Sequence, residues 1–201
     1  MAAMLRSWRL FGVLVLATSM AIAIKLPATD LRSAEGTEII VMRAVLCALP
    51  WLLVAFTASS LATLWPSRFT RWLLANRRYI GLAFAAGMGW HFALVGYFFV
   101  TFGNRLHPLD LAIDIVSLLV LAAMTLTSFP RFARRLSVAG WRRLHRTGIY
   151  VLWFAPAYFY FNDFLRDRDR FDAVATGVFL AAFALRVAAR VRRSAPASQP
   201  A

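Results

Sequence analysis

Long apolar runs separated by short polar connections make up most of the chain. Six runs stand out, at residues 10–27, 39–65, 79–102, 111–129, 147–161 and 171–191. An apolar run of about 20 residues crosses a hydrocarbon core roughly 30 Å thick. Because a chain inside lipid must satisfy its own backbone hydrogen bonds, each run is expected to be a helix. The pattern therefore predicts an all-α, polytopic membrane protein built as a bundle of six transmembrane helices.

The six runs differ in length. The first and fifth are short, and the last contains only 13 uncharged residues in succession, at 173–185. We expect this last helix to cross the bilayer with Arg186 and Arg190 extending their guanidinium groups to the interface. The first run has a basic start and an apolar middle, so a cleaved signal peptide is the alternative interpretation of that segment.

Basic residues are distributed unevenly over the connections. The second and fourth connections contain arginines and no acidic residue, whereas the first, third and fifth mix both signs. Positive residues accumulate on the cytoplasmic side of a membrane, so the pattern predicts that both termini lie inside. We expect residues 1–193 to form one transmembrane domain in a bacterial inner (plasma) membrane, and residues 194–201 to form a disordered tail.

Composition narrows the functional classes. Of the 201 residues, 61% are hydrophobic, and the net charge is +14. The arginines flank apolar runs, so the lipid bilayer is the expected partner and nucleic acid is not. Cys47 is the only cysteine, which excludes an intrachain disulfide and a thiolate metal cluster. No glycine-rich dinucleotide or phosphate loop is present, so the chain carries no recognisable nicotinamide or flavin domain.

The three histidines are the candidate metal ligands. His91 follows Arg78 by 13 residues, which places it about 20 Å along the helix predicted over 79–102. Gly87 shares its helix face and would leave room for a flat group beside the imidazole. The alternative is a histidine that hydrogen-bonds across helices, with Gly87 serving close helix packing.

The other two histidines lie nearer the ends of predicted helices. His145 comes two residues after Arg143, and His107 lies in a short connection, so a surface role is the alternative for each. Imidazole is a common axial ligand of haem iron, and haem can be held between helices by such ligands. With a single cysteine and few carboxylates in the apolar runs, haem is the metal cofactor that the sequence favours.

Several stretches resemble a known family. They are NRRYIGL and GWH within 76–91, TSFPRFARRL and WRRLHRTGIY within 127–150, AP at 155–156 and, more weakly, VMRAVL and WLLVAF within 41–56. They are similar to the ferric reductase-like transmembrane domain family, and most of all to the haem-binding subunits of periplasmic methionine sulfoxide reductase systems (the MsrQ group). The resemblance implies a b-type haem subunit that passes electrons across the inner membrane to a periplasmic reductase subunit. Quinol or a separate flavin reductase would be the electron donor, with FMN or quinone as the electron source.

The resemblance also assigns four ligand positions. Relatives with two haems carry two histidines on each of two helices, and the corresponding residues here are Arg77 with His145 and His91 with Tyr158. We therefore expect one haem b on His91, with Tyr158 as a weak second ligand or an open site. His145 is then either the ligand of an inner haem or a polar anchor. Pro156 is placed to kink the helix between His145 and Tyr158.

One further residue bears on the cofactor. Arg43 lies four residues into the second apolar run, where it is placed to pair with haem propionates. A salt bridge to Asp114, or extension of the side chain to the interface, is the alternative. The competing functional class is a haem-free membrane scaffold or assembly subunit, since each ligand pair keeps only one histidine.

Overall fold

The computed structural model describes residues 7–103 and 107–194. These ranges contain seven α-helices and one short 3₁₀ helix, and they contain no strand. The elements are α1 (Ser7–Ala23), η1 (Leu26–Ala28), α2 (Ala34–Leu64), α3 (Arg68–Phe102), α4 (Pro108–Leu126), α5 (Pro130–Ala133), α6 (Val138–Asp167) and α7 (Arg170–Ser194). The prediction of an all-α protein is confirmed. The tail expected at 194–201 lies outside the described residues except for Ser194, which ends α7.

Five helical segments in the described part of the chain are long and apolar enough to cross a membrane. They are α1 together with η1, α2, α3, α4 and α7. The predicted character of a multi-pass membrane protein is confirmed to this extent. The remaining predicted segment, at 147–161, falls inside α6. This helix has 30 residues, a length of about 45 Å, but it is not among the five.

Several arginines assigned to connections lie inside helices instead. Ser67 caps α3, and its side chain and that of Thr70 exchange hydrogen bonds with each other's backbone in a capping box. The side chain of Ser137 accepts from the backbone of Gly140 at the start of α6. Because serine caps begin each helix well before its apolar run, the arginines that precede these runs occupy roughly the first three turns of α3 and α6. Their side chains therefore have fixed directions relative to the bundle.

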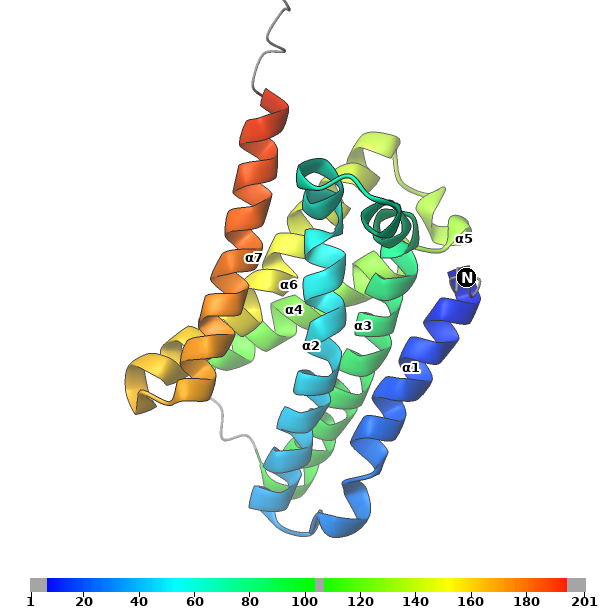
Figure 1. The fold of residues 1–201 in the computed structure, drawn as a ribbon. Helices are drawn as coiled ribbons and strands as arrows, with labels where there is room; N and C mark the ends of the chain where they lie inside the picture. The colour runs from blue at the N-terminus through cyan, green and yellow to red at the C-terminus, as the bar shows by residue number, and fades with distance from the viewer. Residues whose placement is uncertain (1–6, 104–106, 195–201) are drawn as a thin grey trace, which may run out of the picture.

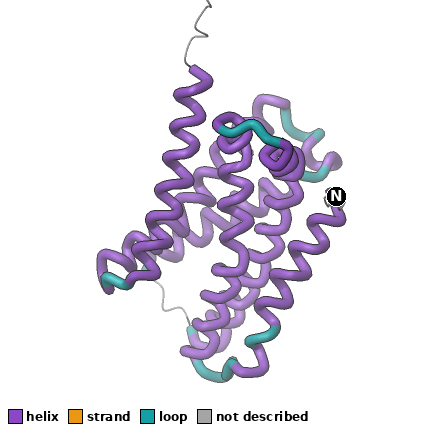
Figure 2. Tube along the Cα trace, viewed as in Figure 1, coloured by secondary structure: helices purple, strands orange, loops and turns teal. Residues whose placement is uncertain are grey.

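The helices form a bundle around a central pair (Figures 1 and 2). α2 and α3 pack along their lengths, and Figure 1 shows α1 and α7 on opposite sides of this pair. α6 packs against α4 and α7, and α4 and α6 lie behind α2 and α3 in this view. Five of these helices, α2, α3, α4, α6 and α7, meet in a common interior.

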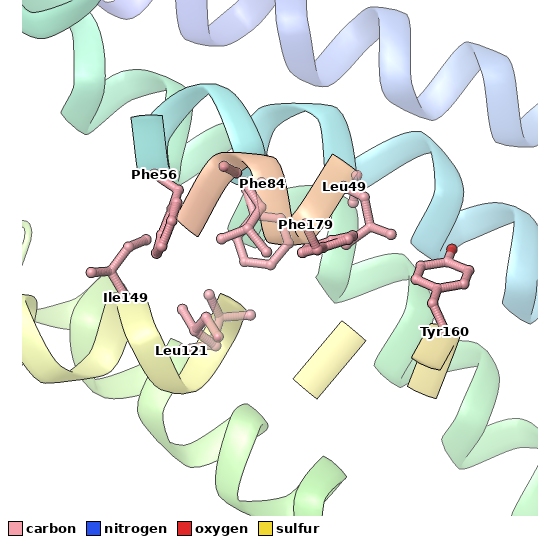
Figure 3. Packing of buried hydrophobic residues seen from close by; sticks show 11 residues of the cluster. Leu49, Phe56, Phe84, Leu121, Ile149, Tyr160 and Phe179 are labelled. Carbon is pink, nitrogen blue, oxygen red and sulfur yellow. The ribbon is translucent and has the colours of Figure 1, made fainter. Parts of the chain in front are cut away.

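A buried cluster fills the middle of this interior (Figure 3). Its members come from α2, α3, α4, α6 and α7, and they include Phe56, which is fully buried and stacks on Trp153 with 5.7 Å between ring centroids. Tyr160 lies at the end of the cluster away from Phe56 in Figure 3. Side-chain packing of this kind, rather than exclusion of water, holds helices together in lipid. The cluster also separates two cavities.

Candidate functional site

Two cavities lie end to end in the bundle and share a wall of Phe84, Leu121 and Leu152. The larger, of about 880 Å³, is lined by His145, and the smaller, of about 210 Å³, is lined by His91. His145 precedes Leu152 by seven residues and His91 follows Phe84 by seven. At 1.5 Å per residue, the two histidines lie about 20 Å apart along the bundle. One group therefore cannot contact both histidines.

The larger cavity is strongly basic, and we call it the basic cavity. Six arginines and His145 line it, and no carboxylate side chain does. The arginines are Arg77 and Arg78 on α3, Arg134 after α5, Arg142 and Arg146 on α6, and Arg186 on α7. Its volume falls within the range of about 300–1,000 Å³ typical of ligand and cofactor sites. A concentration of positive charge without an acidic partner favours an anionic ligand.

Two of these arginines bind the same turn of α2. Arg77 Nε donates to the carbonyl oxygen of Ala55 at 2.8 Å, and a terminal nitrogen of Arg186 donates to that of Phe56 at 2.9 Å. The Arg186 guanidinium also lies over the rings of Phe56 and Tyr150, 4.3 and 4.6 Å from their centroids. The prediction that Arg186 extends to the interface is therefore wrong. Carbonyl and aromatic partners on α2 and α6 hold it inside the bundle.

The hydrogen bonds of Thr127 favour one tautomer of His145. Its Nε2 lies 3.1 Å from Thr127 Oγ1, and that hydroxyl donates its one proton to the carbonyl of Ala123 at 2.6 Å. With that proton directed to Ala123, Nε2 donates to the hydroxyl and the lone pair lies on Nδ1. The ring stacks on Trp141 with 4.3 Å between centroids.

The charge state of His145 agrees with this assignment. His145 precedes the apolar segment that begins at Thr147. Burial, and then the positive charge of Arg77, lower the pKa of its imidazole. A lowered pKa favours the neutral imidazole, which is the form that binds a metal.

Glycines shape the walls of the basic cavity. Gly81 lines it, and a Cβ atom at this position would meet no atom within 4 Å, so the α3 wall is open there. A Cβ at Gly148 would instead overlap the side chain of Met124. Gly148 thereby lets α6 approach α4 closely, next to the bond between Thr127 and His145.

The smaller cavity is acidic, and we call it the acidic cavity. Asp114 and Asp163 line it together with His91, Ser117 and Tyr160, and neither lysine nor arginine does. His91 Nδ1 and the hydroxyls of Ser117 and Tyr160 are buried without a hydrogen-bond partner in the described ranges. The imidazole of His91 also interacts with the backbone of Val41. At about 210 Å³, this cavity lies below the usual range for a cofactor site.

Gly87 does not leave space beside His91. A Cβ atom on Gly87 would lie 2.8 Å from Cβ of Ala48 and 3.3 Å from Cγ2 of Thr18. Gly87 therefore serves the close packing of α3 against α2 and α1, the alternative role considered for it.

Tyr158 lies outside the wall of the acidic cavity, whereas Tyr160 is part of it. Tyr158 stacks on Phe154 with 6.1 Å between ring centroids. A helix turns about 100° per residue, so Tyr158 lies about 220° around α6 from His145, and Tyr160 only about 60°. This helical phase is the sequence pattern that would have pointed to Tyr160.

The remaining candidates have structural partners elsewhere. Arg43 Nε donates to the carbonyl of Ala21 in α1 at 2.9 Å, whereas Asp114 faces the acidic cavity. His107 caps α4, and its Nδ1 accepts from the backbone nitrogen of Leu109 at 3.3 Å. Of the sequence-derived ligand positions, Arg77 and His145 thus share one cavity, and His91 lies in the other.

No three His, Cys, Asp or Glu side chains of the described residues are grouped so that they could hold a metal ion. A metal bound by a single histidine needs further ligands, which a macrocycle such as haem supplies. Comparison of the chain with family models, curated proteins and solved structures finds no match.

Proposed function

We propose that this protein is a membrane electron-transfer subunit that holds one b-type haem in the basic cavity, with His145 as the iron ligand. The observation that carries the proposal is a cavity of about 880 Å³ lined by six arginines and one histidine, without a carboxylate. Haem is complementary to this cavity. It has a large apolar ring, two anionic propionates and an iron that binds an imidazole nitrogen.

The residues present fit that group. Leu82, Phe84 and Ile149 give the cavity apolar surfaces against which the ring would pack. The arginines would bind the propionates, since guanidinium matches the geometry of a carboxylate. His145 would offer its Nδ1 lone pair, while Thr127 holds the other ring nitrogen. When bound, haem supplies reversible one-electron chemistry.

Size is the reason for preferring His145 to His91. The sequence alone favoured a haem on His91, near the other end of the bundle. The cavity at His91 has about a quarter of the volume of the basic cavity, and the position of Gly87 is filled by Ala48. It also presents Asp114 and Asp163, which would repel propionates.

The membrane arrangement belongs to the same proposal. Residues 147–161 of α6 form the sixth crossing, both termini are cytoplasmic, and the basic cavity opens at the cytoplasmic side of a bacterial inner membrane. The arginines at the starts of α3 and α6 support this orientation. The resemblance to ferric reductase-like proteins of the MsrQ group supports electron flow from quinol or a flavin reductase to a periplasmic reductase or other acceptor.

A haem-free scaffold or assembly subunit is the second candidate. The observation that favours it is the single histidine in each cavity, where two-haem relatives have two. Haem content separates the two functions. Protein purified from membranes of haem-supplemented cells is expected to show a Soret band and about one haem per chain by the pyridine haemochrome method. A folded but colourless protein would favour the scaffold.

A further inference from the structure

The acidic cavity contains buried polar groups that the proposed haem site does not use. His91, Ser117 and Tyr160 are 8, 7 and 5% exposed, so each is more than nine-tenths buried. All three line this cavity, and His91 Nδ1 and both hydroxyls lack a hydrogen-bond partner among the residues that the structure describes. An unsatisfied buried polar group costs about 1–3 kcal/mol. Three such groups around one cavity point to a ligand that hydrogen-bonds to them.

The acidic residues of the cavity wall indicate the sign of the ligand's charge. Asp114 on α4 and Asp163 on α6 line it without an arginine or lysine, although the chain has 23 basic and only 9 acidic residues. Asp110 acts electrostatically on both, and Asp172 on Asp163. Burial and then the neighbouring Asp172 raise the pKa of Asp163. Arg166 acts on Asp163 in the opposite sense, but it does not line the cavity. Carboxylates without a basic residue in the same wall favour a cationic ligand.

The hydrogen-bonding capacity of the lining side chains further limits the chemical class of the ligand. Carboxylates only accept hydrogen bonds, and hydroxyls and a neutral imidazole nitrogen can also accept them. Every polar side chain that lines the cavity can therefore accept a hydrogen bond, and none carries a permanent positive charge. The complementary group is a cation with N–H donors, namely a primary ammonium.

The apolar part of the wall favours an organic cation over a metal ion as the ligand. Most lining residues are apolar, among them Phe92, Phe159 and Met88. Aromatic faces attract organic cations, whereas a metal ion would need more oxygen ligands than this wall offers. The described residues also contain no group of three potential metal-binding side chains. The volume of about 210 Å³ limits the ligand to a small molecule.

We propose that the acidic cavity binds a small primary ammonium compound, with its N–H groups directed to Asp114, His91 and Tyr160 and a short apolar body against Phe92 and Phe159. The site is independent of haem, because the shared wall of Phe84, Leu121 and Leu152 lies between the two cavities.

Isothermal titration of the purified full-length protein in detergent tests this site. Butylammonium chloride is expected to give saturable binding at one site per chain. Sodium chloride and butan-1-ol at equal concentrations should give none, since the first lacks N–H donors and the second lacks charge. Absence of butylammonium binding to a folded protein overturns the proposal. Equal binding of butan-1-ol identifies an apolar cavity alone, and competition by sodium identifies an inorganic cation site. Either result also overturns it.

Two variants localise the site. Asp114→Asn is expected to weaken butylammonium binding by about 30-fold or more, because it removes a partly buried charge partner. Asp110→Asn, on the same helix but outside the cavity wall, should stay within about threefold of the parent protein. Equal losses in the two variants would contradict the assignment. If Asp114→Asn does not fold, Tyr160→Phe replaces it, with an expected loss of about fivefold. Haem content measured in the same samples distinguishes failure of this site from failure of the haem site.

Discussion

Arg77 and Arg186, from α3 and α7, donate hydrogen bonds to the neighbouring carbonyl oxygens of Ala55 and Phe56 on α2. Two guanidinium groups are thereby held side by side at the edge of a cavity that has no carboxylate in its wall. Two positive charges held next to each other repel, and the repulsion is stronger where water is scarce. A bound anion would remove that cost, so the pair is placed to bind the acidic groups of the proposed haem.

This relationship predicts the effect of removing one guanidinium. Arg186→Gln should weaken haem binding by about tenfold or more, because it removes a charged hydrogen-bond donor from the basic cavity. Arg190→Gln is the matched control, since Arg190 lies one turn further along α7, is exposed and does not line the cavity. Titration of haem into purified apoprotein, followed at the Soret band, measures both. Equal losses in the two variants would show that Arg186 has no special role.

Position 158 gives a second test. The resemblance to ferric reductase-like proteins places Tyr158 where they carry a histidine, but Tyr158 lies outside both cavity walls. Tyr158→His should therefore leave the haem spectrum and its spin state unchanged. A shift of ferric haem to a low-spin spectrum, seen as loss of the electron paramagnetic resonance signal near g about 6, would place residue 158 at the iron and contradict the orientation of α6.

Helix packing can be tested at two glycines of α3. Gly87→Ala should destabilise the protein by about 1–3 kcal/mol, because the new methyl group would lie 2.8 Å from Cβ of Ala48. Gly89→Ala has open space around its Cβ and should be neutral or stabilising by up to about 1 kcal/mol. Thermal unfolding in detergent, followed by tryptophan fluorescence, compares them. Equal effects would contradict the close approach of α2 and α3 at Gly87.

The proposed topology makes a prediction for reporter fusions. Fusions at Arg71 and Arg135 should report a cytoplasmic location, and fusions at Glu35 and Arg168 a periplasmic one. The equivalent prediction at Arg105 concerns a residue outside the described ranges. A periplasmic signal from Arg135 would contradict six crossings with both termini inside.

The positions of the apolar helices were the predictable part of this protein. Apolar runs located all five membrane-compatible helices, because hydropathy acts along the chain. The starts of α3 and α6 were placed too late, since the caps at Ser67 and Ser137 extend these helices into arginine-rich sequence. Local capping residues in the sequence carry that information.

Side-chain direction was harder to predict than helix position. The resemblance assigns Tyr158 to a ligand position, but rotation about the helix axis decides which residue lines a cavity, and here that residue is Tyr160. Arg186 turns inward because carbonyl and ring partners on α2 and α6 are within reach. Such partners belong to other helices, so no local pattern reveals them. The different volumes of the two cavities likewise depend on how five helices pack together.

Measuring which histidine is required for haem binding tests the central proposal most directly. Pyridine haemochrome analysis should be made on purified, folded His145→Ala and His91→Ala proteins beside the parent protein. The parent and His91→Ala proteins are predicted to carry about one haem per chain, and His145→Ala to lose most of it. Loss of haem in His91→Ala with retention in His145→Ala would contradict the assignment of haem to the basic cavity.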